Sequence, residues 1–397
     1  MKRSPNDLAI LGGMAAFREP LHVGRPNIGD REYLMALLQD MFDRRWLTND
    51  GPFVIEFERR IAMMLGVRHC VATCNATVAL EIAARAAGFT GEVIVPSFTF
   101  IATAHALQWQ GITPVFCDID PDTHNIDPDR IEALITPRTS GIIGVHLWGR
   151  ACNVEAIERI AHRYGLGVIY DAAHAFGCTH RGKPIGSAGR AEIFSFHATK
   201  FLNAFEGGAV VTNDDELAGK IRLMKNFGFD GVDQVVYIGT NGKMAETSAA
   251  MGLTSLQRID HFTAVNRENH DRYRNGLRDI PGISMRTDGQ GETYNYHYVV
   301  LEINEEQAGL SRDTLCAILR AENVLARRYF YPGCHRMEPY RSYFPHAGLL
   351  LPETERLTTR VLSLPTGTAV GTEHIEKVCE LIHFAIGHAP AVIQAMA

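Results

Sequence analysis

The chain has 397 residues, of which 46% are hydrophobic, and a formal net charge of −6 at pH 7. This length and apolar content predict a large domain with a smaller companion, each with its own core. The mildly acidic balance, without any block of basic residues, argues against nucleic acid or an anionic membrane surface as the main partner.

Helices and strands are predicted to alternate along the first half of the chain. Apolar residues at every fourth position from Phe53 to Leu65 predict an amphipathic helix that ends at Gly66. Short apolar runs predict strands, and the segments between them predict helices. The strands are expected at 70–73, 93–96, 114–118, 141–145 and 167–171, and the helices at 78–87, 101–110 and 154–164. This alternation is typical of an α/β fold with a mostly parallel sheet covered on both faces.

The second half of the chain predicts a smaller α+β unit. A long helical stretch begins near Met244 and keeps an apolar face as far as Leu277, as expected for a connector between two domains. After it we expect a strand at 296–303, a helix at 312–323, a basic-aromatic patch at 327–331 and a last helix at 373–386. We therefore predict a large domain at residues 1–255, including an N-terminal arm, and a small C-terminal domain at 256–397.

Four polar residues are placed where predicted strands end. In parallel sheets, ligands bind beyond the carboxyl ends of the strands. One pocket at that edge is therefore expected to gather Asn75, Ser97, His146 and Asp171.

Lys200 gives the most specific chemical signal in the sequence. It follows Ser195 in the run Ser-Phe-His-Ala-Thr-Lys and lies twenty-nine residues after Asp171. A lysine amine can form a Schiff base with pyridoxal phosphate (PLP), and a carboxylate facing the pyridine nitrogen keeps that ring protonated. Because Phe196 and Phe201 flank Lys200, burial is expected to disfavour the charged amine and make it more nucleophilic. A plain surface lysine fits this context poorly.

The residues around this pair have both a structural and a functional interpretation. The turn with Ala76 and Thr77, at the start of a predicted helix, could bind a phosphate together with the Ser195 hydroxyl, or could merely cap the helix. His174 could stack on the cofactor or be a satisfied structural histidine. Phe100 could lie against the opposite face of the cofactor or belong to the core.

Cysteine, histidine and hydropathy patterns predict neither a metal site nor a membrane span. The eight cysteines have irregular spacing without a Cys-x-x-Cys pair, and no His-Glu-x-x-His group occurs. Most of the cysteines are expected to be small core residues in a reducing compartment. No apolar stretch approaches membrane-spanning length, so a cytoplasmic location is expected.

The ordered motifs of the chain resemble those of the DegT/StrS family of PLP-dependent nucleotide-sugar aminotransferases. The resemblance extends nearly from end to end, and its blocks are 25–27, 46–52, 96–100, 171–174, 195–200 and 239–244. It implies PLP-dependent transferase fold type I, the aspartate aminotransferase-like fold, with a seven-stranded sheet in the large domain.

The resemblance also implies roles for individual residues. Lys200 would be the Schiff-base lysine, Asp171 the pyridinium partner and Phe100 the stacking ring. Ala76, Thr77 and Ser195 would hold the phosphate. Asn241 is similar to a family asparagine that reaches the phosphate of the neighbouring subunit, so a homodimer with shared active sites is implied. Many relatives carry glutamine at the position of His174, which we also count among the catalytic and cofactor-binding residues.

The implied substrates are L-glutamate and a nucleotide-linked keto sugar. The motifs at 145–150, 196–208 and 331–335 look closest to enzymes that aminate the 4-keto group of dTDP-4-keto-6-deoxy-D-glucose, with pyridoxamine phosphate as the intermediate form of the cofactor. The predicted substrate-binding residues are Arg25, Trp148, Lys243, Arg328 and Tyr331. The alternatives are another nucleotide keto sugar (a 3-keto sugar, or one linked to GDP or UDP), a PLP-dependent sugar dehydratase, and a regulatory PLP-binding protein.

Overall fold

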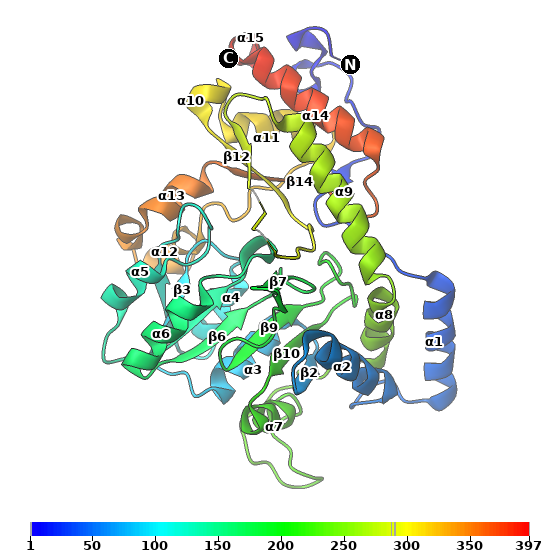
Figure 1. The fold of residues 1–397 in the computed structure, drawn as a ribbon, viewed down its shortest axis with the longest axis vertical. Helices are drawn as coiled ribbons and strands as arrows, with labels where there is room; N and C mark the ends of the chain where they lie inside the picture. The colour runs from blue at the N-terminus through cyan, green and yellow to red at the C-terminus, as the bar shows by residue number, and fades with distance from the viewer. Residues whose placement is uncertain (1, 287, 290, 397) are drawn as a thin grey trace.

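A seven-stranded sheet forms the centre of the larger part of the molecule (Figure 1). The computed structural model describes residues 2–286, 288, 289 and 291–396. The strands of this sheet, in spatial order, are β2 (His69–Thr73), β10 (Gly208–Thr212), β9 (Ala191–Ser195), β6 (Gly167–Asp171), β5 (Thr139–Val145), β3 (Glu92–Pro96) and β4 (Thr113–Cys117). Only β10 runs against its neighbours, so the predicted mostly parallel sheet is confirmed.

Helices cover both faces of this sheet. Successive side chains of a strand point to opposite sides, so each strand offers residues to the helices of both faces. Cys70 and Ala72 pack with the helices of one face, whereas Val71 between them packs with those of the other. The first face carries α2 (Pro52–Leu65), α6 (Val154–Tyr164) and α8 (Glu246–Leu256). The second carries α3 (Ala76–Ala86), α4 (Ala102–Gln108) and α7 (Asp215–Met224). The predicted two-sided α/β layering is therefore confirmed.

The connector between the two parts consists of two helices and not of one. Helix α8 ends at Leu256, and α9 (Ile259–Leu277) begins after a break at Gln257 and Arg258. The apolar periodicity continues across the break because α8 packs on the first face of the large sheet, whereas the end of α9 packs in the smaller part. The prediction of one continuous helical stretch was wrong at this point.

The smaller part is built on a three-stranded antiparallel sheet of β11 (Ile283–Met285), β12 (Val299–Ile303) and β14 (Val361–Leu364). Its core also contains residues of α9, α11 (Arg312–Ala321) and α14 (Thr372–Gly387). The chain start packs here as well: Leu8, Phe17 and Leu21 are buried in this core, and β1 (Leu21–His22) pairs with β13 (Val324–Leu325). The 3-10 turn Pro5–Asp7 contacts α15 (Ala389–Met396), and Figure 1 shows both at this end of the molecule.

The N-terminal packing bears on the domain division. The division into 1–255 and 256–397 remains a proposal, and Leu8, Phe17, Leu21 and His22 lie with the second part instead of the first. The strand predicted at 296–303 begins only at Val299, because Tyr296 adopts a left-handed backbone (φ 50°) and interrupts the extended run.

The remaining elements are short or peripheral. They are α1 (Arg31–Arg44), α5 (Pro128–Ile131), α10 (Glu305–Ala308), α12 (Tyr340–Tyr343), α13 (Pro352–Thr358), α15 (Ala389–Met396), β7 (Thr179–His180) and β8 (Lys183–Pro184), with 3-10 turns at Pro5–Asp7, Ala9–Leu11, Glu132–Leu134, Leu147–Gly149, Cys334–Arg336 and Ala347–Leu350. All eight cysteines are free, and all but Cys74 are buried, as expected of small core residues. Among the described residues, no group of three potential metal ligands occurs. Within the same residues no single helix is long and apolar enough to span a membrane, and only α14 and α15 pass as a pair, bent by 81°.

Candidate active site

A pocket of about 540 Å³ lies at the edge of the sheet where its parallel strands end. Residues that follow β2, β3, β6 and β9 form one wall, and residues near the start of β12 and after β13 form the other. The residues of the first wall include Asn75, Ala76, Thr77, Phe100, Asp171, His174, Ser195 and Lys200. Those of the second are His297, Tyr298, Arg327, Tyr329 and Phe330.

Lys200 brings an amine of lowered pKa into this pocket. It follows β9, in a turn closed by a hydrogen bond from its backbone N–H to the carbonyl oxygen of His197 (2.8 Å). Burial lowers the pKa of the Lys200 amine to about 8, against the opposing attraction of Asp171. Its Nζ donates to the Tyr298 hydroxyl at 3.3 Å. A minority of the amine, on the order of one tenth, is therefore uncharged near neutral pH and able to attack a carbonyl carbon.

Asp171 provides a buried carboxylate at the end of β6. Its Oδ2 accepts from the Thr103 hydroxyl (2.8 Å), and its Oδ1 accepts from the Ala173 N–H (3.1 Å). Burial raises the pKa of Asp171, while these two hydrogen bonds and the charge of Lys200 lower it. A cation that faces this carboxylate would stabilise its ionised form, and a protonated ring nitrogen is such a cation.

The start of α3 forms an anion-binding turn. Asn75 caps the helix through its side-chain oxygen, which accepts from the Val78 N–H at 2.9 Å. The N–H groups of Ala76 and Thr77, in the first turn, have no intrahelical acceptor and lie at the positive end of the helix dipole. Gly208 on β10 permits the close approach, because a Cβ there would lie 2.5 Å from the Ala76 nitrogen. The capping and phosphate-binding interpretations are thus compatible. Asn75 caps the helix, and the N–H groups of Ala76 and Thr77 are left to bind a phosphate.

His174 belongs to an aromatic stack on the floor of the pocket. Its ring stacks on Trp148 (5.7 Å between centroids) and Phe330 (6.0 Å), and it lies 4.3 Å from the ring of Tyr298. Its Nδ1 accepts from the backbone N–H of Trp148 at 3.3 Å. Burial holds the pKa of His174 well below its usual value, so the ring is neutral. Phe100, by contrast, lines the pocket with 53% of its surface exposed and is not a core residue.

Comparison with known proteins identifies the family. The model of the DegT/DnrJ/EryC1/StrS aminotransferase family matches residues 29–383. The chain belongs to this family. It is therefore an aminotransferase, and both the expected membership and the expected fold type are confirmed.

Relatives of this aminotransferase family match almost the whole chain. A dTDP-4-amino-4,6-dideoxy-D-glucose transaminase of Escherichia coli is 38% identical over 91% of this chain and 97% of its own length. The Shigella dysenteriae enzyme of the same name is 39% identical over 92% and 98%. The structure of DesI in the presence of its TDP-sugar product is 54% identical, with a TM-score of 0.93, over 96% of this chain and 97% of that one.

Several residues predicted for the site lie outside the lining of this pocket. Arg25, Asn241, Lys243, Arg328 and Tyr331 do not line it in the described protomer. Lys243 donates to the Asn226 side chain (3.0 Å), and Arg328 pairs with Asp313 (3.0 Å). Trp148 lies behind His174 and lines a small neighbouring cavity instead of the pocket itself.

The prediction that four strand-end residues share one pocket was correct for Asn75 and Asp171 only. Ser97 is fully buried and its hydroxyl pairs with His335 Nδ1 (2.7 Å). His146 is buried between Cys152 and Glu192, with its ring stacked on Tyr170. Both side chains turn into the protein interior, because each residue lies one position beyond the end of its strand and successive residues of an extended chain point to opposite sides.

The second wall of the pocket escaped the sequence prediction almost entirely. His297 and Tyr298 fall within the region predicted as a strand, and Tyr329 and Phe330 within the basic-aromatic patch. These residues occupy irregular segments without a motif of their own. The only available signal was the density of aromatic rings around positions 294–298 and 329–331.

Proposed function

We propose that this aminotransferase uses PLP to move the amino group of L-glutamate to the 4-keto group of dTDP-4-keto-6-deoxy-D-glucose, giving dTDP-4-amino-4,6-dideoxy-D-glucose in two alternating half-reactions. The observation that carries the proposal is the Lys200 amine, with a pKa lowered to about 8, in one pocket with the Asp171 carboxylate and the start of α3. These groups match the three parts of the cofactor that a protein must hold: its aldehyde, its ring nitrogen and its phosphate.

The residues present fit PLP at both ends. The free N–H groups of Ala76 and Thr77, with the Ser195 hydroxyl, would hold the phosphate. Because Gly208 has no side chain, nothing from β10 blocks these N–H groups. Asp171 would face the ring nitrogen, while Phe100 and His174 would contact the ring. When bound, PLP supplies an electron sink that stabilises negative charge developing on the substrate carbon.

The chain's own groups then position the substrates and move a proton. The neutral Lys200 amine would take a proton from the substrate carbon, and its protonated form would deliver that proton to a second carbon, the former aldehyde carbon of the cofactor. The Tyr298 hydroxyl holds the Nζ atom at 3.3 Å, and the pKa of this phenol is raised well above its usual value by burial, so it stays protonated. A protonated ring nitrogen would keep Asp171 ionised against the burial that raises its pKa.

The sugar assignment is supported by the relatives. The Escherichia coli and Shigella dysenteriae proteins are named for dTDP-4-amino-4,6-dideoxy-D-glucose, and DesI was crystallised with a TDP-sugar product. In this chain Arg327 lines the pocket next to Tyr329, on whose ring its guanidinium lies (4.9 Å). We add Arg327 to the proposed substrate-binding residues Arg25, Trp148, Lys243, Arg328 and Tyr331.

A homodimer with shared active sites completes the proposal. Near Asn241 the chain exposes Phe227, Val232 and Ile238, with 46%, 87% and 76% of their surface accessible. Exposed apolar side chains in such numbers mark an interaction surface. In a dimer, Asn241 and Lys243 would approach the partner's pocket, which accounts for their absence from the pocket of their own protomer. The cytoplasmic location remains a prediction.

The visible absorption spectrum of the PLP-saturated protein tests the proposal directly. We expect the band of lysine-bound cofactor to disappear on adding L-glutamate and to return on adding dTDP-4-keto-6-deoxy-D-glucose. If the band disappears but does not return, the glutamate half-reaction stands and the proposed sugar is wrong. If the PLP-saturated protein never shows the band, the role proposed for Lys200 is wrong.

A further inference from the structure

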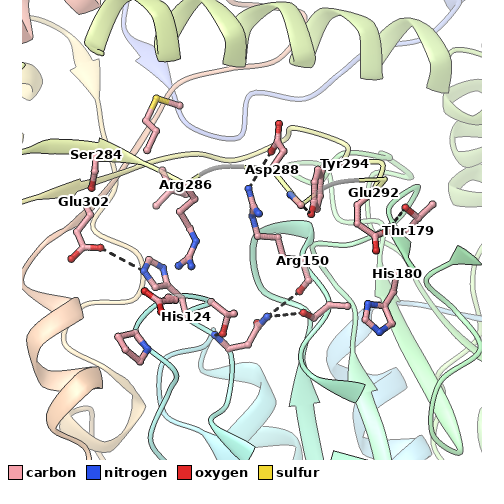
Figure 2. Close-up of a pocket in the computed structure, with 18 residues that line it drawn as sticks. His124, Arg150, Thr179, His180, Ser284, Arg286, Asp288, Glu292, Tyr294 and Glu302 are labelled. Atoms are coloured by element: carbon pink, nitrogen blue, oxygen red, sulfur yellow. Dashed lines mark hydrogen bonds and ion pairs between the residues drawn. The ribbon is translucent and has the colours of Figure 1, made fainter. Parts of the chain in front are cut away.

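A second cavity, of about 650 Å³, lies between the two parts of the molecule (Figure 2). The loop from Pro121 to Asn125 and Arg150 line it on the side of the large sheet, and the segment around β11 and β12 lines it on the other. None of its lining residues lines the catalytic pocket. A small neighbouring cavity shares Arg150 and Arg286 with it and reaches Trp148 and Tyr298.

Arg286 brings an unpaired positive charge to this cavity. Its Nη1 is buried and has no hydrogen-bond partner in the part of the chain that the structure describes. Burial lowers the pKa of Arg286 to about 10, and the positive charge of Arg150 acts in the same direction. Figure 2 shows the guanidinium reaching from the end of β11 toward the loop that carries His124. A buried guanidinium nitrogen without an acceptor is costly, and a bound anion would remove that cost.

Three of the four described carboxylates that line the cavity have partners other than Arg286. Asp288 pairs with Arg150 at 3.2 Å, and Glu302 pairs with Arg356 at 3.0 Å. Glu292 accepts from the Thr179 hydroxyl at 2.7 Å. Asp122 belongs to the exposed part of the lining. Apart from that of Asp122, the negative charges of the walls therefore have other partners, and no carboxylate pairs with Arg286 among the described residues.

His124 adds a second polar atom without a partner. Its side chain is 2% exposed, and its Nδ1 is buried with no hydrogen-bond partner among the described residues. Its Nε2 lies 3.7 Å from a Glu302 carboxylate oxygen, and burial lowers the pKa of the ring. A neutral ring with its proton on Nε2 leaves Nδ1 as an acceptor, which suits a hydroxyl group.

We propose that this cavity binds a small oxyanion, a hydrogen phosphate or a carboxylate, through Arg286, with His124 as the second contact. Guanidinium is well suited to both anions because its N–H groups match two oxygens at once. Hydrogen phosphate also carries a hydroxyl group that could donate a hydrogen bond to His124 Nδ1. The site is separate from the one assigned to PLP and does not depend on the proposed function.

Calorimetric titration of the PLP-saturated protein tests this inference, with inorganic phosphate and succinate as separate probes at constant ionic strength in chloride. At least one probe should bind to the wild type, and the one that binds more tightly identifies the source of the oxyanion. Arg286→Gln should weaken that binding at least about tenfold, because a hydrogen bond to a charged group is lost. The matched control is Arg327→Gln, which removes the same charge from the catalytic pocket and should leave the binding unchanged.

Three results would overturn the proposal: no binding of either probe to the wild type, equal binding to Arg286→Gln, or loss of binding in Arg327→Gln alone. A labelling experiment covers the case in which Arg286→Gln does not fold. Phenylglyoxal modifies accessible arginines, and phosphate or succinate should protect the peptide that contains Arg286 in the wild type. Equal labelling with and without both anions would reject the site.

Discussion

The two walls of the catalytic pocket are built in different ways. The wall with Asn75, Asp171 and Ser195 consists of residues that end strands or follow them closely, so the hydrogen bonds of the sheet fix their positions. The wall with Tyr298 and Arg327 comes from irregular segments that packing of the smaller part holds in place. Side chains on rigid strands are suited to bonds that must stay fixed, and side chains on loops to adjusting around a substrate. We therefore expect the first wall to carry the residues that react, and the second wall to position the reacting groups and select the substrate.

The largest effect is expected at the first wall, from Lys200→Ala. Without the amine, no base remains beside the substrate carbon, and turnover should fall by about 10⁴-fold or more. Steady-state transamination with L-glutamate measures it. The exposed Lys183 provides the control Lys183→Ala, which should retain wild-type turnover. Turnover that survives Lys200→Ala would show that the sheet-edge wall does not carry the reaction.

Mixed dimers extend the comparison to a third wall, contributed by the partner subunit. If Asn241 acts across the interface, a dimer of one Lys200→Ala and one Asn241→Ala subunit contains one intact site. At limiting PLP, such dimers, purified through two tags, should show about half of wild-type activity, although each parent homodimer is weak. Activity no higher than the mean of the two parents would place Asn241 in its own protomer's site. Failure to isolate any mixed dimer would contradict the dimer itself.

A smaller effect is expected from Asp171→Asn, on the same wall as Lys200. Loss of the carboxylate removes the charge that holds a ring nitrogen protonated, and kcat should fall on the order of 10³-fold. The control Asp260→Asn changes an exposed aspartate on α9 and should leave kcat unaltered.

The same variant should also change the pKa of Lys200. Because the Asp171 charge favours the protonated amine and so raises this pKa against burial, its removal should move the pKa below the wild-type value of about 8. The pH dependence of amine modification in the cofactor-free protein measures it, with Lys200→Ala as the background. A midpoint that stays at the wild-type value or rises would show that Asp171 does not act on Lys200 electrostatically.

The same contrast explains what the sequence could predict. Lys200, Asp171 and Asn75 are predictable because strand ends and motif spacing are local properties of the chain, and parallel strands end at one edge. Ser97 and His146 meet the same criterion, yet their side chains point into the interior. Strand ends alone do not say on which side of the sheet a side chain falls, and a single residue of register changes it.

Long-range packing explains the remaining errors. The apolar pattern predicts a strand through Tyr298, and nothing local indicates that the left-handed Tyr296 interrupts the extended run and turns the next residues toward Lys200. The burial of Leu8 in the core of the smaller part likewise depends on contacts with segments far along the chain. The unpaired Nη1 of Arg286 becomes visible only once its neighbours are placed. Such features arise when separate segments meet, and no periodicity encodes them.

Among the single substitutions, the smallest loss, and the sharpest test of the second wall, is expected from Tyr298→Phe. This change removes the hydroxyl that accepts from Lys200 Nζ and keeps the ring that packs against His174. Because the lysine must be held between two carbons only while it moves the proton, kcat should fall about tenfold with the KM of the sugar unchanged. Tyr329→Phe is the matched control, since Tyr329 lines the same wall beside Tyr298 and should leave kcat as it is. A rise in KM at constant kcat would instead make Tyr298 a substrate-binding residue. The second wall would then select the substrate without positioning Lys200.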